Sequence, residues 1–455
     1  MTRVRPAVGR HRGALSRTNV FACAAANYYV SKPASRVKSS NRRTFLKSTL
    51  AATAASVAAP YVHAARQRPH LRVLGTHVTL QEEIRQRAMA DLDIDITFAP
   101  GGSAEVLQRA ASKPESFDVY EQWSDSLQVL WRSNAIQAVD IERLEYWNEI
   151  NSLTKTGRLT PEAPLGAGDA PFRLLYVQTD GTLGSTPSEQ ISFLPYVHNA
   201  DSFGYNTRTI PRRVAYDSES WGMLLDPQWA GRVGLVNAPS IGIFDVALAA
   251  RAQGLMTFAD IGNMTRHEID TLFSILVEYK QRGHFAGMWN SVPESIEFMA
   301  SGRTLLSSMF SPAATSLNGM GHPVVYAAPR EGYRAWHGVM CLSSKTAGHE
   351  KDAAYRFMNW WLSGWAGAFI ARQGYYISNV DRSREYLSDA EWDFWYGGKP
   401  AARALTGTDG KISVRPGEIR NGGSYTNRFS HIAVWNSIMD VYEYSLPLWH
   451  EFLLA

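Results

Sequence analysis

The chain has 455 residues, of which 45% are hydrophobic and 11% aromatic, so it can build a large core, and its length suits two or three globular units. The formal net charge of +4 comes from residues 1–65, which carry 11 Lys and Arg and no Asp or Glu. Residues 66–455 carry 35 basic and 42 acidic residues, a net charge of −7, which argues against a broad nucleic-acid-binding surface.

Residues 1–65 read as a leader that resembles a twin-arginine export signal. Arg42 and Arg43 precede "FLK", a small apolar run follows over 49–60, and Ala64 and Ala65 offer a small-residue cleavage position. The alternative is a basic tail before a short helix. The apolar run is too short to span a membrane, and no later run is long enough. We therefore expect the twin-arginine export machinery as a partner, cleavage near Ala64 or Ala65, and a periplasmic mature protein.

The chain has two cysteines, and only one of them lies beyond the leader. Cys23 belongs to the leader, whereas Cys341 stands alone inside "GVMCLS", an apolar strand-like stretch. Cleavage would leave Cys341 without a disulfide partner, and its surroundings favour a buried thiol over a nucleophile.

Strand-like and helix-like segments alternate after the leader, which is typical of an α/β fold with a parallel sheet. The expected strands are 70–75, 94–100, 117–123, 304–310, 323–329 and 337–344. The expected helices are 79–92, 103–112, 124–134, 240–254, 265–283 and 349–363.

Several helix ends carry recognisable signals. The helix over 265–283 begins with a capping box formed by Thr265 and Glu268. Ser124 is expected to cap the helix over 124–134, and Ser240 the helix over 240–254. Trp360, Trp361 and Trp365 are expected to share one helix and to lie in the core.

The stretch "LPYVHNADSFGYN", residues 194–206, has the apolar and aromatic content of a buried strand. It nevertheless carries His198, Asn199 and Asp201 in its middle. Polar groups in a buried strand are costly unless they are paired or used, so this segment is a candidate functional element.

The sequence lacks the common signatures of catalysis. It contains no nucleotide-binding glycine motif, no nucleophile elbow and no H-E-x-x-H, and its His residues have no metal-ligand spacing. Tyr375 and Tyr376 are adjacent, as in some ferric-iron sites, but core packing with one ring in a pocket is the better reading. We expect no cofactor and no metal, and no enzyme activity.

Six segments, in order, resemble one family. They are "FDVYEQWSDSLQVLWRSNAIQAVD", "LPYVHNADSFGYNT", "SWGMLLDPQWAGRVGLVN", "SIEFMASGRTLLSSMFSPAA", "APREGYRAWHGVMCLSSKTAGHEKDAAYRFMNWWLS" and "QGYYISN". Together they resemble the extracellular solute-binding proteins of ABC importers, and among these the spermidine/putrescine-binding group. The likeness runs from about residue 70 to about residue 445.

The resemblance implies a type II-like periplasmic binding protein, with two lobes that each hold a mixed β-sheet flanked by helices. It implies lobe I at 70–197 plus 334–383, lobe II at 198–333 plus 384–455, and a ligand cleft between them. Residues 194–206 would be the first crossover between the lobes. The implied partners are a small-molecule solute and the ABC permease subunits, which read the hinge-closed form.

The resemblance also implies which residues face the cleft. They are Thr76, His77, Trp123, Asp125, His198, Asp201, Ser240, Phe310, Trp336, His337 and Tyr375. Several keep alternatives open: Asp125 as a helix cap, Trp123 as a core residue, and Ser240 as a cap or as part of an anion site at a helix N-terminus.

The acids expected for polyamine binding are missing at the corresponding positions. Thr76 and His77 stand where the group has an aromatic residue and a Glu, and His337 stands near an acid position. Each lost carboxylate removes a charged hydrogen bond worth ~1.5–3 kcal/mol. An uncharged or singly charged solute therefore fits better than a polyamine. A periplasmic enzyme with a His/Asp pair and a ligand-sensing receptor are the competing functions.

Overall fold

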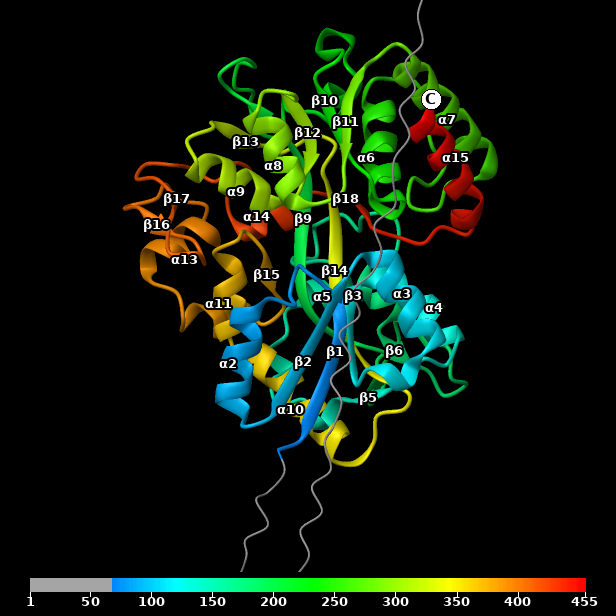
Figure 1. The fold of residues 1–455 in the computed structure, drawn as a ribbon, viewed down its shortest axis with the longest axis vertical. Coiled ribbons are helices and arrows are strands. Elements are labelled where there is room, and N and C mark those ends of the chain that lie inside the picture. Colours follow the sequence, from blue (N-terminus) through cyan, green and yellow to red (C-terminus); the bar gives the residue numbers. More distant parts are fainter. Residues whose placement is uncertain (1–67) are drawn as a thin grey trace, which may run out of the picture. The chain divides into compact units, whose positions relative to one another are not determined.

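The computed structural model describes residues 68–455 (Figure 1). The proposed export signal and its cleavage position lie outside the described residues. The first sheet region has β1 at its centre, paired in parallel with β2 and β3. Its strands and the helices that follow them are β1 (His70–Thr76), α2 (Glu82–Leu92), β2 (Asp95–Gly101), α3 (Ser103–Ser112), β3 (Val119–Trp123) and α4 (Leu127–Arg132).

The second sheet region has β10 at its centre, paired in parallel with β11 and β12. Its elements are β10 (Val233–Val236), α6 (Pro239–Ala252), α7 (Arg266–Gln281), β11 (Phe285–Trp289), α8 (Val292–Ala300), β12 (Leu306–Met309), α9 (Ser311–Gly319) and α15 (Tyr442–Leu454). The capping box of Thr265 and Glu268 is present at the start of α7, as predicted.

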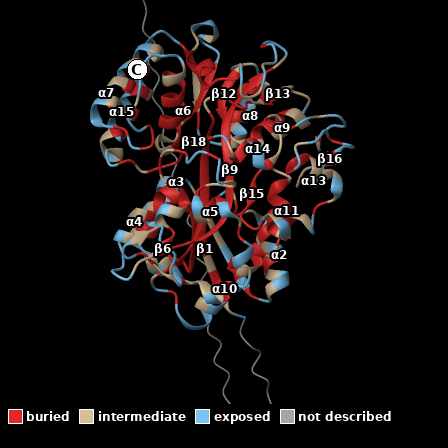
Figure 2. Cartoon of the chain, turned by 180° about the vertical axis from the view of Figure 1, so that it is seen from behind, coloured by how far each residue is buried: buried red, intermediate tan, exposed pale blue. Residues whose placement is uncertain are grey.

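Two long strands connect the two regions: β9 (Leu194–Asn206) and β14 (Tyr333–Ser343). They pair with each other in antiparallel fashion from Leu194 to Asp201. Beyond Asp201, β9 pairs with β12 and β13 (Val324–Tyr326), whereas β14 pairs with β3 at its other end. Every residue of both strands is buried, and Figure 2 shows β9 as buried. The predicted crossover is therefore a continuous buried strand.

Short elements surround this frame. Between β3 and β9 lie β4 (Ile136–Gln137), β5 (Val139–Asp140), α5 (Ser152–Thr156), β6 (Tyr176–Val177), β7 (Leu183–Gly184) and β8 (Gln190–Ile191). After β14 come α10 (Gly348–Leu362), α11 (Trp365–Ala371), β15 (Tyr376–Ile377), α12 (Val380–Arg384), α13 (Asp389–Trp395), β16 (Leu405–Thr406), β17 (Ile412–Val414), α14 (Tyr425–Phe429) and β18 (Ile432–Trp435).

The buried apolar side chains form three large clusters. The first lies within 71–197 and 336–377, and the second within 203–327 and 434–452. A third, rich in aromatic rings, brings α11, α13 and α14 together with Ala200 of β9 and with Tyr333 and Ala335 of β14. Cys341 is a buried strand thiol of β14, as the sequence predicted.

Three local predictions were wrong. Ser124 does not cap a helix: a 3₁₀ turn over Ser124–Ser126 precedes α4, and the Ser124 hydroxyl makes no hydrogen bond within the described residues. Ser240 lies inside the first turn of α6, because Pro239, whose fixed φ suits a first helical position, begins that helix. Trp365 belongs to α11, because Gly364, with φ of +113°, ends α10 before it.

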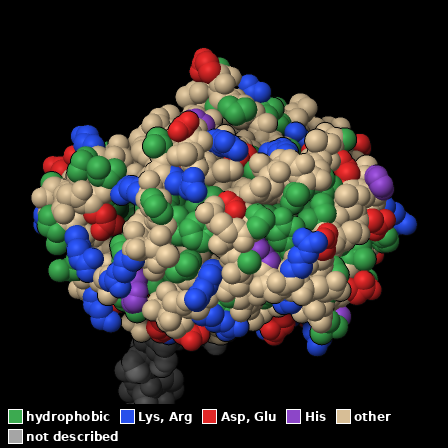
Figure 3. All heavy atoms as spheres, turned by 90° about the horizontal axis from the view of Figure 1, so that it is seen from above, with side chains coloured by type: hydrophobic (Ala, Val, Ile, Leu, Met, Phe, Trp, Pro, Cys, Tyr) green, Lys and Arg blue, Asp and Glu red, His purple; other side chains and the backbone are tan. Residues whose placement is uncertain are grey.

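Charged side chains of both signs are interspersed over the face drawn in Figure 3. Between residues 68 and 455, no helix combines the length and the apolar content needed to cross a membrane. The same part of the chain contains no cluster of three or more His, Cys, Asp or Glu side chains that could hold a metal ion.

Candidate functional site

A small cavity, which we call the cleft cavity, lies where the two sheet regions meet. Its lining residues are Val78, Trp123, Asp201, Ile241, Phe310, Trp336, Tyr375 and Asn436. They come from the chain just after β1, the end of β3, the crossing strands β9 and β14, the first turn of α6, and the segments that follow β12, α11 and β18. The free volume is about 10 Å³, room for one water molecule, so a larger solute requires the lining to move apart.

Four of the eight residues that line the cleft cavity are aromatic. The Trp336 ring makes edge-to-face contacts with Trp123 and with Tyr375, each with centroids 5.6 Å apart. Phe310 contacts Trp289 in the same way at 5.1 Å. Trp336 and Tyr375 are buried, whereas Trp123 and Phe310 are half-buried. Such edge-to-face contacts hold the rings in fixed orientations around the cavity.

Asp201 supplies the only carboxylate in this lining. Its Oδ1 accepts hydrogen bonds from Asn199 Nδ2 at 2.9 Å and from Tyr326 Oη at 3.1 Å. Its Oδ2 lies 3.6 Å from Arg334 Nη2 and has no hydrogen-bond partner within the described residues. Oδ1 is thus held in place by two hydrogen bonds, while Oδ2 can still accept a hydrogen bond.

Arg334 joins two carboxylates at this point. Its Nε donates to Asp245 Oδ1 at 2.6 Å, and its Nη1 donates to Asn436 Oδ1 at 3.1 Å. Asp201, Asp245 and Arg334 are all completely buried. With both acids ionised, one positive and two negative charges leave the group with a net charge of −1. Burial raises the pKa of Asp245 to about 6 and also raises that of Asp201, since Arg334 only partly offsets the desolvation of two carboxylates.

Two further buried acids, Glu121 and Asp125, lie outside the lining of the cleft cavity. Glu121 accepts hydrogen bonds from the Thr76 amide and hydroxyl, both at 3.0 Å, and from the Tyr196 hydroxyl. Burial raises the pKa of Glu121 to about 7. Burial also raises the pKa of Asp125 to about 7, against the opposing effect of the Ser240 hydroxyl. Thr76, Asp125 and Ser240 lie outside the lining of the cleft cavity.

The three histidines also lie outside that lining, and His77 is exposed. His198 and His337 are fully buried and stack on each other with ring centroids 5.4 Å apart. The His198 Nε2 is 2.8 Å from the Tyr425 hydroxyl, in the third apolar cluster. Burial lowers the pKa of both rings, that of His337 to about 3.

The alternation of side chains along β9 explains this division. Asn199 and Asp201 are two residues apart, so they share one face of the strand and hydrogen-bond to each other. His198 is on the opposite face. The structure therefore gathers five of the predicted site residues at the cleft cavity: Trp123, Asp201, Phe310, Trp336 and Tyr375.

Three lining residues were missed. Val78 and Ile241 are the sequence neighbours of the predicted His77 and Ser240. Both are apolar, and the sequence search looked for polar and aromatic side chains at these positions. Asn436 lies in a C-terminal segment for which the sequence offered no signal. Arg334 was missed as well, although an Arg within the apolar stretch "YRAWHGVM" indicates a buried charge that needs partners.

Two sheet regions joined by crossing strands, with a cavity where they meet, define the class of two-lobed solute-binding proteins. The sequence profile of the bacterial extracellular solute-binding proteins matches residues 85–389, more than half of the chain. The chain belongs to this family, and the family resemblance read from the sequence is confirmed. No curated protein matches the chain in sequence.

Several solved structures share the fold. A putative spermidine/putrescine ABC transporter protein from Listeria monocytogenes is 13% identical, with 84% of this chain and 98% of that chain covered and a TM-score of 0.59. The TpPotD lipoprotein of Treponema pallidum is 12% identical, with 85% of this chain and 100% of that chain covered and a TM-score of 0.58. AgtB from A. tumefaciens, in complex with agropinic acid, is 14% identical, with 85% of this chain and 99% of that chain covered and a TM-score of 0.52. The expected two-lobed α/β fold is thereby confirmed.

Proposed function

We propose that this protein is the periplasmic solute-binding component of an ABC importer, which captures a small organic solute and delivers it to the permease subunits of the inner membrane. The observation that carries the proposal is a polar and aromatic cavity at the point where two long crossing strands join the two sheet regions. Such a connection allows hinge closure around a solute.

The lobes of this proposal are 70–197 plus 334–383 and 198–333 plus 384–455. The first two apolar clusters support the division, because each draws almost entirely on one of the two sets. The third cluster contains residues of both sets, among them Tyr376 and Tyr425, and would be the region nearest the hinge. The eleven predicted site residues remain part of the proposal. Those that line the cleft cavity would contact the solute, whereas His198 and His337 would support the crossing strands.

We infer that the solute is a small organic cation with a single positive charge. Aromatic faces attract an ammonium group by about 0.5–2 kcal/mol each. Asp201 adds a carboxylate oxygen that lacks a hydrogen-bond partner, in a charge group whose net value is −1. A polyamine carries two or more charges and would leave some of them without a carboxylate.

Native mass spectrometry of the protein purified from the periplasm tests this function directly. We expect a bound small molecule, released when the protein unfolds, and a raised melting temperature when it is added back. Asp201→Asn should reduce that shift, while Asp217→Asn, on the exposed surface, should preserve it. A protein that no small solute stabilises would contradict the proposal.

Export by the twin-arginine pathway is part of the same proposal. It rests on the order of Arg42-Arg43, the apolar run and the small residues near Ala64 and Ala65. Replacing Arg42 and Arg43 together by Lys should retain the protein in the cytoplasm. The intact mass of the periplasmic protein in the parent strain should correspond to cleavage near Ala64 or Ala65. Normal export of the Lys-Lys variant would contradict this part.

We propose binding without turnover. An acid–base pair must lie within hydrogen-bond reach of a bound solute. His198 and His337 instead contact Tyr425, Phe429 and each other. The mass of a solute incubated with the protein should stay constant, and the appearance of a product would favour an enzyme.

A further inference from the structure

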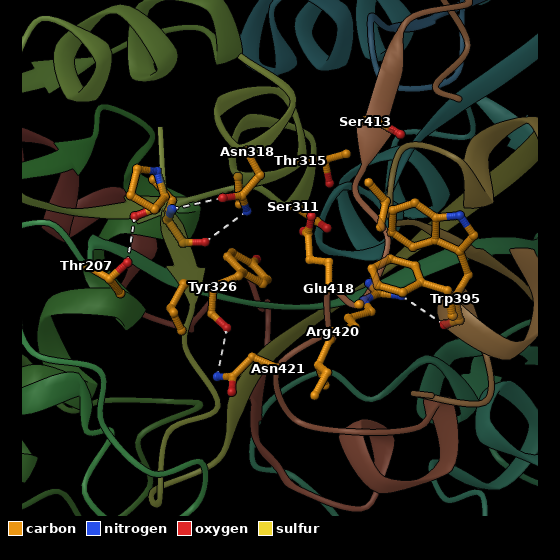
Figure 4. A pocket seen from close by; sticks show the side chains of 18 of the residues that line it. Thr207, Ser311, Thr315, Asn318, Tyr326, Trp395, Ser413, Glu418, Arg420 and Asn421 are labelled. Atoms are coloured by element: carbon orange, nitrogen blue, oxygen red, sulfur yellow. Dashed lines mark hydrogen bonds between the residues drawn. The ribbon is translucent and has the colours of Figure 1, made fainter. Parts of the chain in front are cut away.

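A second cavity, larger than the cleft cavity, lies beside α9 and has a free volume of about 310 Å³ (Figure 4). It shares no lining residue with the cleft cavity. One wall consists of Ser311, Ala314, Thr315 and Asn318, which recur every three or four residues along α9. The opposite wall comes from residues 394–428. A volume of this size falls within the range of small-molecule sites.

Two arginines of this wall are buried, Arg420 with 9% exposure and Arg428 with none. Arg420 donates to the carbonyl oxygens of Trp395 at 3.0 Å and Gly374 at 2.9 Å, and to the Tyr376 hydroxyl. The bond to Trp395 is drawn in Figure 4. All of these acceptors are neutral.

Arg428 likewise has only neutral acceptors. It donates to the carbonyl oxygens of Asn421 at 2.9 Å and Ala200 at 3.0 Å, and to the Tyr333 hydroxyl at 3.3 Å. Its Nε is buried and has no hydrogen-bond partner within the described residues. No carboxylate of residues 68–455 lies within ion-pair distance of either guanidinium. Arg334, the other arginine with no exposure among residues 68–455, has two such carboxylates.

The nearby acids are engaged elsewhere. Glu418 lines the second cavity, and its Oε2 accepts a hydrogen bond from the Arg415 amide at 3.1 Å. Glu219 accepts hydrogen bonds from Tyr205, from the Ala328 amide and from Asn421. Two buried positive charges thus remain without a neutralising anion, an arrangement that costs several kcal/mol per ion unless a partner is supplied.

We propose that the second cavity is a binding site for a small organic anion, with a carboxylate or phosphate group held by Arg420 and Arg428. The hydroxyls of Ser311 and Thr315 would donate to the same group from α9 (Figure 4). The rings of Trp395 and Phe394, which also line the cavity, would contact its apolar part. Guanidinium groups match both kinds of anion through paired hydrogen bonds. The site is separate from the proposed cation site and does not depend on it.

Sodium benzoate and inorganic phosphate are suitable probes, at constant ionic strength set with sodium chloride. At least one of them should raise the melting temperature saturably and give a measurable Kd by calorimetry. Benzoate alone would indicate a carboxylate ligand, and phosphate alone a phosphate ligand; either result supports the proposal. Absence of a saturable response to both probes would overturn it.

Matched charge substitutions on α9 test the location. Thr315→Glu places a carboxylate in the cavity, whereas Ser316→Glu places one on the exposed face of the same helix. Like-charge repulsion of about 1.4 kcal/mol should weaken the probe about tenfold in Thr315→Glu. Ser316→Glu should bind as the parent does, and equal binding by both variants would overturn the proposal.

A crystal soaked in 4-bromobenzoate provides an independent readout. The anomalous bromine peak should lie between α9 and Arg420, and a peak only elsewhere would overturn the assignment. Trp123→Leu, which alters the cleft cavity and does not touch the lining of the second cavity, should leave benzoate and phosphate binding unchanged. This comparison separates a failure of the anion site from a failure of the cation site.

Discussion

Asp201 and Arg334 lie directly opposite each other on β9 and β14, with Oδ2 and Nη2 3.6 Å apart and neither side chain exposed to solvent. The pair sits where the crossing strands reach the cleft cavity, and Asp245 on α6 completes it from the second sheet region. The same three residues therefore tie the two regions together and set the charge beside the cavity.

The first prediction concerns the carboxylate of the cleft cavity. Choline has no N–H to donate, so Asp201→Asn removes a charge–charge attraction of about 1–4 kcal/mol at a separation of about 4 Å, and choline, used as a probe cation, should bind about 10–100-fold more weakly. Calorimetry measures the change, and urea unfolding verifies that the variant is folded. Asp217→Asn is the matched surface control. Binding of choline to Asp201→Asn within twofold of the parent would mean that Asp201 does not contact the cation.

The second prediction concerns stability. Arg334→Gln leaves Asp201 and Asp245 buried without their cation and should lower the free energy of unfolding by about 3–5 kcal/mol. Arg330→Gln removes a pair in which the Arg330 side chain is 54% exposed, and should cost less than about 1 kcal/mol. Urea unfolding compares the two variants. Similar losses would show that the buried pair has no special role.

The third prediction concerns the aromatic wall. Trp123→Leu removes one ring from the cleft cavity, and a cation–π contact worth ~0.5–2 kcal/mol corresponds to about 2–30-fold weaker binding of choline. Trp131→Leu is the control, because Trp131 is half-buried on α4 and does not line the cavity. An equal effect of both substitutions would argue against direct contact with the ring of Trp123.

The fourth prediction concerns pH. Burial raises the pKa of Asp125 to about 7 from 3.8, so the folded state binds its proton more tightly than the unfolded state does. The contribution of Asp125 to stability is therefore fully present below about pH 4 and is lost as the pH rises through 7.

Asp125→Asn removes this dependence. The stability of the variant relative to the parent should increase by roughly 2–3 kcal/mol between pH 5 and pH 8, as measured by urea unfolding at both values. Leu127→Ala, in the same segment, should shift stability equally at both pH values. A constant difference between Asp125→Asn and the parent would indicate that the Asp125 carboxyl is already ionised at pH 5.

Much of the fold could be predicted because its signals are local. The start of α7 follows from a capping box within four residues, and the apolar face of that helix follows from spacing. The crossover β9 was identified from one continuous apolar stretch and the family resemblance. The predictions that helices begin at Ser124 and Ser240 were wrong for two different reasons. A 3₁₀ turn over Ser124–Ser126 precedes α4, and Pro239 begins α6 one residue before Ser240.

The candidate site depends on contacts that are distant in sequence. Whether His198 or Asp201 points toward the cavity is set by the register of β9 against β14, which no short motif encodes. Arg334 meets Asp245 across 89 positions and Asn436 across 102. The sequence indicated that the polar groups of the crossover need hydrogen-bond partners or a ligand. The fold determines which of these groups face the cavity.

The cleft cavity is proposed to bind a small organic monocation. Calorimetry with choline, its uncharged isostere 3,3-dimethylbutan-1-ol, and spermidine tests it most directly, on the parent protein and on Asp201→Asn. Choline should bind at least about tenfold more tightly than either of the others, since one charge contributes about 1.4 kcal/mol or more, and Asp201→Asn should remove that preference. Tightest binding of spermidine, or equal binding of choline and its isostere, would contradict the claim.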